Sequence, residues 1–429
     1  MIISLSRKTD IPALTGLRLF AALSVCVAHL LSHVYAITAS EPAWALEMSR
    51  LSAEGMTLFF VLSGFVIHYN YGTFLQQHVK LGTYHFLIAR LARLWPLYFI
   101  CLGLDLIRQL VQFTPIHWLA LPYYLTLTQS WFYYPMAGKA LVYQWGPMPS
   151  IAWSVSTEWF FYLCYPLLCL ALLKIDTIFK KIVFMLAVSV FIIVTVAKLS
   201  INIDAINTVA SHHFGPIGDF NLHPDDSFFR WLIYFSPYAR LGEFIIGCLI
   251  AALYQELATK NPTHSEARYG FILLCTAFVG LVGAHYLIFH SSTYPHLQWL
   301  IQLHRCGGFT PFFAIIIFCC ARYQNSFSQF FSWPLLIAGG EMSYSIYLLH
   351  PPIASICFHY LHNNTTSLWI AFGLALSLIL TVAHFSYRYI EKPARSLLRK
   401  QLGFLIHPSS KQDTTYIESF ISIPRDTKE

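Results

Sequence analysis

Charged residues are scarce in this sequence. Asp, Glu, Lys and Arg make up only 11% of its 429 residues, whereas a soluble domain carries about a quarter. Hydrophobic residues make up 56%. This composition excludes an ordinary soluble domain and predicts a multi-pass integral-membrane protein.

Several motif classes are also missing. The ten cysteines show neither a CxxC pair nor the ligand spacing of a zinc site, so we expect small core residues and no metal. No run of Lys and Arg is interleaved with aromatic residues, so the net charge of +7 does not predict nucleic-acid binding. The first apolar run is too long for a signal peptide. The histidines expected in outer loops also lack metal-ligand spacing: His212, His213, His223, His296 and His304.

Long apolar runs dominate what is present. A helix needs about 20 mostly apolar residues to cross a bilayer. By this measure the sequence predicts an all-α, polytopic bundle of about ten transmembrane helices, at residues 14–36, 55–72, 94–112, 151–173, 181–200, 236–256, 269–290, 308–322, 334–358 and 368–390. We expect an integral-membrane domain over residues 1–400, a polar cytoplasmic tail over 401–429, and both termini in the cytoplasm.

The run at 117–134 is a candidate for an eleventh span, but Pro122 interrupts it. With ten spans, 19 of the 27 Lys and Arg residues fall on the cytoplasmic side and four on the outer side. An eleventh span would move the Lys174–Lys181 cluster outside. The positive-inside rule therefore favours ten spans. Residues 113–150 are then expected to form an outer re-entrant or interfacial loop that is buried in protein.

The first span contains two ionisable residues, Arg18 and His29. They are eleven positions apart, so they lie within about 20° of one helix face and about 16 Å apart along the axis. The residues between them on this face are small: Ala21, Ala22 and Val25. Ionisable residues inside a membrane usually mark a functional path, and this stripe predicts one wall of a cavity. The alternative is that Arg18 reaches the inner interface and His29 bonds a neighbouring helix.

Further ionisable residues lie in other spans. Glu158 is near the outer end of the fourth span, and His350 is in the outer half of the ninth. His29 has a similar depth, so we expect these three groups to share a polar site. Arg90 and Arg93 are expected at the inner mouth of the third span. The alternatives are a helix–helix hydrogen bond for Glu158 and membrane anchoring for the two arginines.

Taken in order, these motifs resemble the acyltransferase 3 family, the integral-membrane O-acyltransferases that include O-antigen acetylases. The resemblance runs from about residue 11 to residue 395 and rests on seven motifs: Arg18-x10-His29, FFVLSGF (59–65), Arg90-x2-Arg93, WSVSTEWFFYLCYP (153–166), RLGEFIIG (240–247), SYSIYLLH (343–350) and YIEKPAR (389–395). The family often has Gly-Val-Asp before the Phe pair, where this chain has Gly55, Met56 and Thr57. Because the chain ends at residue 429, we expect the stand-alone form, without a fused hydrolase-like domain.

The resemblance implies an enzyme that transfers an acyl group, usually acetyl, from cytoplasmic acyl-CoA to a hydroxyl. The implied acceptor is a glycan or lipid-linked sugar, such as a surface polysaccharide, lipopolysaccharide, peptidoglycan or exported glycoside. The implied location is the cell (inner) membrane. Acyl-CoA would be a substrate, so we expect no permanently bound cofactor.

The same resemblance suggests roles for the ionisable residues. His29 would be the general base, a function that typically contributes about 10²–10⁴-fold. Glu158 would either orient the imidazole or hold the acceptor's other hydroxyls. Arg90 and Arg93 would bind CoA phosphates, and Arg18 would meet the pantetheine or pyrophosphate.

Five more residues are candidates for substrate-binding or supporting roles. Ser63 and Gly64 offer a hydroxyl and a close backbone approach, or else a tight helix crossing. Ser343, Tyr347 and His350 share a helix face; they would line the acceptor side, support His29, or make a helix contact. Ser63 or Ser343 could carry the acyl group in a two-step route. The sequence places no base beside either serine, so direct transfer is expected.

Two further acidic residues are expected to be structural. Arg240 and Glu243 are three positions apart and would pair in the interior, and Glu391 would close the last helix. The competing functional class is a multi-pass transporter, since buried charges also line substrate routes. The absence of an internal repeat argues against a carrier. A non-catalytic scaffold would make His29 dispensable.

Overall fold

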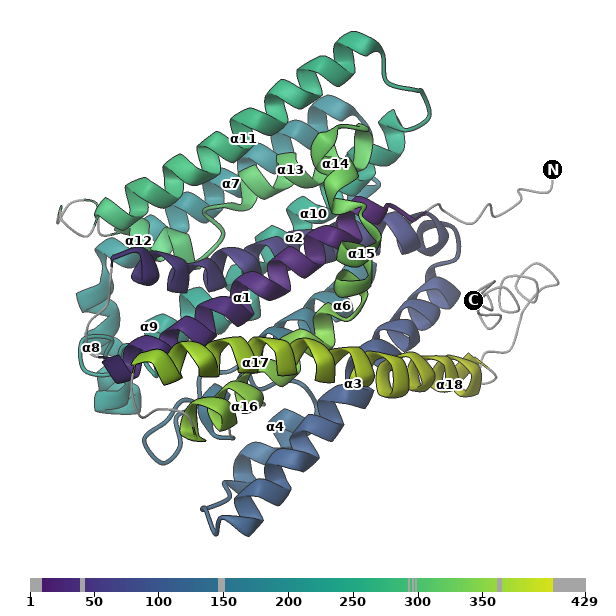
Figure 1. Cartoon of the computed structure of the whole chain (residues 1–429). Helices are drawn as coiled ribbons and strands as arrows, with labels where there is room; N and C mark the ends of the chain where they lie inside the picture. Colours follow the sequence, from purple (N-terminus) through teal and green to yellow (C-terminus); the bar gives the residue numbers. More distant parts are fainter. Residues whose placement is uncertain are drawn as a thin grey trace.

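The computed structural model describes residues 10–38, 43–145, 151–291, 294, 297, 299–360 and 365–403. These residues form a bundle of helices (Figure 1). The described part contains no β-strand, and one isolated β-bridge joins Met136 and Lys139. The predicted polar tail lies outside the described residues from position 404 onward.

The polytopic helical bundle predicted from the sequence is confirmed. Among the described residues, nine helical segments are long and apolar enough to cross a membrane. They belong to α1 (Pro12–Thr38), α2 (Ala43–Gln77), α3 (Val79–Val111), α6 (Trp153–Leu172), α7 (Ile178–Ile201), α9 with α10 (Phe228–Arg230 and Pro237–Leu257), α11 (His264–Ser291), α12 with α13 (Trp299–Arg305 and Thr310–Arg322), and α17 with α18 (Thr365–Ser386 and Lys392–Gly403).

The remaining predicted span, 334–358, is a broken helix. It is divided at Met342 into α15 (Pro334–Glu341) and α16 (Ser343–Tyr360). In Figure 1, α15 and α16 together run from the right-hand side of the bundle to the left, and α17 and α18 return to the right. The first turns of α1 and the last turns of α18 therefore lie on the same side of the bundle in Figure 1.

The segment that follows α3 does not form an eleventh span. Residues 113–145 contain only the short helices η1 (Trp118–Ala120), α4 (Leu121–Leu125) and η2 (Leu141–Tyr143). Hydrogen bonds inside the protein hold this segment: the Tyr124 hydroxyl donates to the Leu141 carbonyl, and the Tyr98 hydroxyl donates to the Tyr124 carbonyl. Irregular backbone at membrane depth is tolerated when it is buried in this way. Residues 146–150 of the predicted loop lie outside the described residues.

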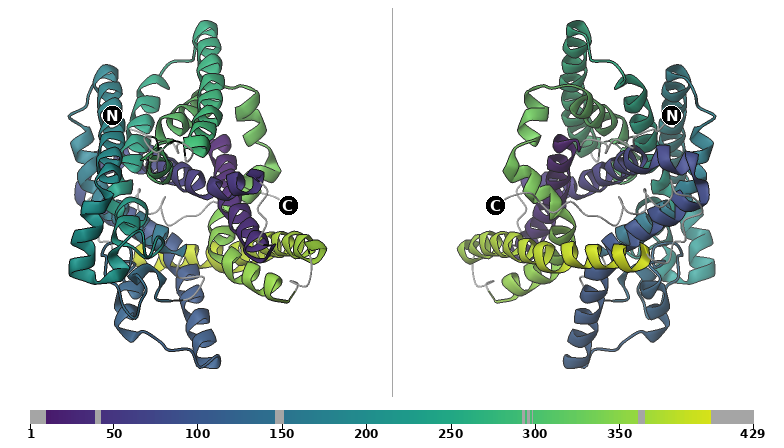
Figure 2. Two further views of the ribbon diagram at one scale, coloured as in Figure 1. Left: turned by 90° about the vertical axis from the view of Figure 1, so that its left-hand side faces the viewer. Right: turned by 90° about the vertical axis from the view of Figure 1, so that its right-hand side faces the viewer.

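The middle of the bundle is built around α2, which packs against α1 and α10. A Cβ added at Gly64 would lie 2.1 Å from the carbonyl oxygen of Phe244, and one added at Gly247 would lie 2.1 Å from that of Val61. The backbones of α2 and α10 therefore touch, and Gly64 serves a tight helix crossing. By contrast, α7 and α11 lie at the periphery, where 11% and 17% of their apolar windows are buried (Figure 2).

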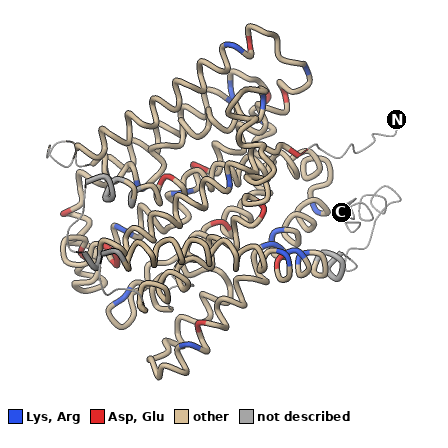
Figure 3. Tube along the Cα trace, in the orientation of Figure 1, with Lys and Arg blue, Asp and Glu red and all other residues tan. Residues whose placement is uncertain are grey.

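The shorter helices α8 (Ile203–Phe214), η3 (Pro216–Gly218) and α14 (Ser326–Phe331) lie between the long ones, whereas η4 (Trp231–Phe235) joins α9 to α10 and η6 (Tyr387–Glu391) joins α17 to α18. Figure 3 shows that the long helices carry few charges, and that Lys and Arg gather where α18 crosses the beginning of α3. The charges that do lie inside the bundle therefore need an explanation of their own.

Candidate functional site

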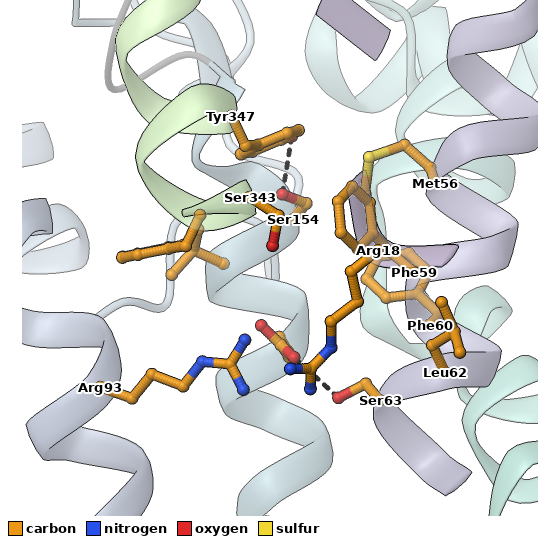
Figure 4. A pocket seen from close by; sticks show the side chains of 13 residues that line it. Arg18, Met56, Phe59, Phe60, Leu62, Ser63, Arg93, Ser154, Ser343 and Tyr347 are labelled. Atoms are coloured by element: carbon orange, nitrogen blue, oxygen red, sulfur yellow. Dashed lines mark hydrogen bonds between the residues drawn. The ribbon is translucent and has the colours of Figure 1, made fainter. Parts of the chain in front are cut away.

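A cavity lies among α1, α2, α3, α6 and α16 (Figure 4). Six residues predicted for the site from the sequence line it: Arg18, Ser63, Arg93, Glu158, Ser343 and Tyr347. The other lining residues are Met56, Phe59, Phe60, Leu62, Ser154, Val155 and Tyr344. Residues more than 300 positions apart in the sequence thus meet in one place.

Positive charge is in excess at this cavity. The guanidiniums of Arg18 and Arg93 extend into the same space from α1 and α3 (Figure 4). Arg18 also interacts electrostatically with Arg90 and with Glu158, and Glu158 accepts a hydrogen bond of 2.7 Å from the Ser63 hydroxyl. Three guanidiniums thus lie near the Glu158 carboxyl group, and the other nearby carboxyl group, that of Glu391, interacts with Arg93 but also pairs with Arg395. Unbalanced charge inside a protein is costly, so the arrangement favours an anionic ligand that brings its own negative charge.

The break between α15 and α16 adds to this preference. Ser343 is the first residue of α16, and its side chain lines the cavity. The free backbone N–H groups and partial positive charge of a helix N-terminus favour anions. Discontinuous membrane helices commonly direct such ends at charged substrates. Because the break is local, it brings this end to the cavity while the rest of α16 continues the crossing.

α3 begins before the third span predicted at 94–112, so Arg90 and Arg93 lie within this helix and not at its start; their predicted place at the inner mouth stays a prediction. α3 begins at Val79 and Arg93 lies fourteen residues further on, about 21 Å along the axis. The helix extends through the charged residues because their guanidiniums find partners inside the protein. Arg90 donates to the Tyr71 hydroxyl at 2.9 Å and its guanidinium carbon lies 5.0 Å from the centre of that ring. Arg90 is only 7% exposed and lies behind the cavity wall, whereas the side chain of Arg93 lines the cavity.

The second part of the site is a pair of imidazoles. Nδ1 of His29 lies 2.7 Å from Nε2 of His350, and the two rings stack with their centres 5.0 Å apart. His350 is fully buried, and His29 is half-buried. His29 therefore faces the interior of the bundle, and the ring that holds it is His350. The Glu158 carboxyl group, which the sequence analysis offered as a residue that could orient the His29 ring, accepts its described hydrogen bond from Ser63 instead.

The hydrogen bonds determine which nitrogen of His29 can act as a base. Nδ1 of His350 lies 2.7 Å from the carbonyl oxygen of Tyr347. A carbonyl only accepts, so this Nδ1 carries the hydrogen, and Nε2 of a neutral His350 accepts. Nδ1 of His29 must then donate to it, which leaves the lone pair of a neutral His29 on Nε2.

Tyr347 joins the two parts of the site. Its side chain lines the cavity, and its ring centre is 5.9 Å from that of His350. Its hydroxyl accepts a hydrogen bond of 2.7 Å from Ser154 and donates to the Ile151 carbonyl at 2.8 Å. Ser343 and Tyr347 line the cavity, and His350 contacts His29. The predicted shared face of these three residues is therefore confirmed, and it runs along α16 from the cavity to the imidazole pair.

The sequence analysis did not predict that some residues of this region belong to the site. Ser154 precedes Glu158 by four positions, so the shared helix face was a usable signal. His33, one turn after His29, stacks on Phe358 with ring centres 5.2 Å apart. Phe59 and Phe60 belong to a recognised motif, but nothing in the sequence shows that they face the cavity.

The two acidic residues with predicted structural roles lie elsewhere. Arg240 and Glu243 form an ion pair with 3.2 Å between Nη2 and Oε2, which confirms the predicted pairing. Glu391 accepts a hydrogen bond from Ser345 of α16 and lies 3.6 Å from Arg395. Glu391 does not end the last helix as predicted, because η6 runs on into α18; its contacts instead tie the middle of this long helix to α16.

Comparison with known proteins gives consistent matches. A family model described as an acyltransferase domain matches residues 11–385. The O-acetyltransferase OatA of Staphylococcus aureus strain MRSA252 is 25% identical over 437 residues, which cover 96% of this chain and 62% of that protein. OatA of strain NCTC 8325 / PS 47 is 24% identical over the same length. A putative O-acetyltransferase of strain COL is 26% identical over 193 residues, which cover 44% of this chain and 29% of that protein.

The chain therefore spans less than two thirds of the length of the OatA proteins that it matches. No solved structure matches the chain. The family match itself covers most of the sequence, and it includes α1, α2, α3, α6 and α16, which together build the cavity and the imidazole pair.

Proposed function

The chain belongs to the acyltransferase family whose domain model matches it from residue 11 to residue 385, and from this premise we propose that it is a membrane O-acetyltransferase. The proposed donor is acetyl-CoA or another acyl-CoA from the cytoplasm. The proposed acceptor is a hydroxyl of a glycan or lipid-linked sugar of the cell envelope, and the proposed location is the inner membrane. The names of the relatives support the acetyl group.

One observation carries the proposal: the positively charged cavity is joined along α16 to an oriented imidazole pair. Arg18 and Arg93 suit the phosphates or pyrophosphate of CoA, because guanidiniums bind such groups bidentately. Arg90 adds a third positive charge from behind the wall, where the Tyr71 hydroxyl accepts its hydrogen bond. The cavity itself, between these cations and Tyr347, would hold the arm that ends in the thioester.

In the proposed reaction, Nε2 of His29 takes the proton from the acceptor hydroxyl as its oxygen attacks the thioester carbonyl carbon. The new C–O bond replaces the C–S bond, CoA leaves as a thiolate, and the proton passes from His29 to that thiolate. His350 holds the His29 ring in the tautomer that this step needs. This direct transfer requires no acyl-enzyme.

A two-step route through Ser63 is the second candidate, because the structure supplies what the sequence did not show. The Glu158 carboxyl group lies 2.7 Å from the Ser63 hydroxyl and could take its proton. Mass spectrometry of the protein after incubation with acetyl-CoA alone distinguishes the routes. Direct transfer predicts an unmodified chain, and an acetyl ester on Ser63 would establish the two-step route.

The function is tested by glycan mass in cells that carry the wild-type gene, no gene, or the His29→Gln variant. We expect an acyl mass increment with the wild type only, because loss of a general base typically lowers a rate by about 10²–10⁴-fold. The control is His384→Gln, which changes an exposed histidine on α17. Unchanged acylation by a His29→Gln protein that is expressed and inserted would refute the role of His29. Absence of any increment with the wild type would refute the proposed acyl transfer.

A further inference from the structure

Three potential metal ligands meet at a place separate from the cavity. They are Glu54 on α2, His285 on α11 and His304 on α12. One ligand atom from each lies within 4.8 Å of the other two. Glu54 and His304 are buried, and the His285 side chain is 21% exposed. No other such group occurs among the residues that the structure describes.

We propose that Glu54, His285 and His304 bind a divalent transition-metal ion, with Zn²⁺ as the best match. Two imidazoles and one carboxylate are common zinc ligands, and three protein ligands leave a fourth position for water. The site would join α2, α11 and α12, and it uses no residue that the proposed acyl transfer needs. The sequence analysis predicted no metal, so this proposal opposes that expectation.

The distances fit a tetrahedral ion after a small adjustment. Bonds of about 2.0–2.1 Å to Zn²⁺ place neighbouring ligand atoms about 3.3 Å apart. Nε2 of His304 lies 3.4 Å from Oε1 of Glu54, which already meets this requirement. Nδ1 of His285 lies 2.5 Å from the same oxygen, a hydrogen-bonding distance. Binding would replace the proton between these two atoms with the metal, release the proton to solvent, and separate the atoms by slightly less than 1 Å.

The surroundings favour an ion over a simple hydrogen-bonded cluster. Nε2 of His304 is a buried atom whose polar contact is the 3.4 Å approach to Oε1 of Glu54, which does not reach good hydrogen-bond geometry. A buried polar nitrogen whose partner is this poorly placed is unusual and needs an explanation. A metal ion supplies one, because it uses the lone pair of the nitrogen and the negative charge of Glu54 together.

A metal would also explain how a peripheral helix is fixed. Only 17% of the apolar window of α11 is buried inside the protein, whereas 78% of that of α2 is buried. α12 has only seven residues and precedes α13 across a short turn. A bond from each imidazole to an ion held by Glu54 would fix both helices to the most buried one. Because binding occurs only in the folded chain, it would stabilise that chain by mass action.

The test uses the full chain, purified in detergent through a tag without histidine. The protein is stripped with a chelator, dialysed against Zn²⁺ and then against buffer, and its zinc is counted by mass spectrometry alongside its melting temperature. We expect about one Zn²⁺ per chain and a rise in Tm for the wild type, and loss of both in Glu54→Gln and His304→Gln. Co²⁺ in place of Zn²⁺ should give the absorption of a tetrahedral site.

Two more variants keep the proposal open to refutation if these substitutions impair folding. His285→Cys replaces one zinc ligand by another and should retain the ion. His290→Gln changes an exposed histidine on the same helix and should behave as the wild type. A wild-type chain that retains no zinc, or a folded Glu54→Gln chain that retains as much as the wild type, would overturn the site. Neither result depends on acyl transfer.

Discussion

Two regions of the bundle contain arginine and glutamate in the interior, and they are built in opposite ways. Arg240 and Glu243 are fully buried and balance each other one to one. The Thr57 hydroxyl accepts from Arg240 and donates to Glu243, both at 3.3 Å, and the Arg305 carbonyl accepts another bond from Arg240. This pair has its partners within the protein and lines no described cavity.

The cavity shows the reverse arrangement. Arg18 and Arg93 are half-buried beside open space, Arg90 lies behind them, and Glu158 is the carboxyl group that they share. The Phe60 side chain separates the two regions, since it lines the cavity and lies 5.1 Å from the guanidinium carbon of Arg240. The comparison indicates that a buried charge marks a binding site when its counter-charge is missing and space is left for a ligand.

The largest effect on stability is expected from Arg240→Ala. Removing one partner of a buried ion pair leaves an uncompensated charge and costs about 3–5 kcal/mol. The double variant Arg240→Met with Glu243→Leu removes both charges and should be closer to the wild type. Thermal unfolding in detergent measures both. A stable Arg240→Ala chain would break the comparison, because the pair would then have no structural role.

A smaller effect, on the substrate and not on the fold, is expected from Arg93→Ala. A hydrogen bond to a charged group contributes about 1.5–3 kcal/mol, so KM for acyl-CoA should rise roughly ten- to a hundredfold while KM for the acceptor and Tm change little. Arg388→Ala, which changes an exposed arginine on η6, is the control. A rise confined to the acceptor KM would refute the donor-side role of Arg93.

The smallest effect is expected from Ser154→Ala at the cavity wall. The change removes the hydrogen bond to Tyr347, whose hydroxyl still donates to the Ile151 carbonyl. A hydrogen bond of this kind contributes about 0.5–1.5 kcal/mol, so Tm should fall by about one degree in a chain of this length. The control Ser377→Ala removes an exposed serine that bonds to its own helix. An equal effect of both variants would mean that the Ser154 contact adds nothing specific to the wall.

Part of the site was predictable because helices have a fixed period. Arg18 and His29 share a face in any α-helix, as do Ser343, Tyr347 and His350, and the positive-inside rule made 113–150 a loop on the outer side and not an eleventh span. The start of α3 was not predictable from hydropathy. Charged residues end an apolar window, but the helix continues where Tyr71 and neighbouring rings accept Arg90.

The sequence by itself determined that the chain is a bundle of long apolar helices, the periodic faces on which ionisable residues lie, and the family. Only the tertiary structure decided which faces meet. It paired His29 with His350, placed Glu158 against Ser63, broke the 334–358 span at Met342 and brought Glu54 to two histidines of distant helices. The physical reason is that helical periodicity acts over a few turns, whereas partners for buried polar groups are set by packing between helices far apart in the chain.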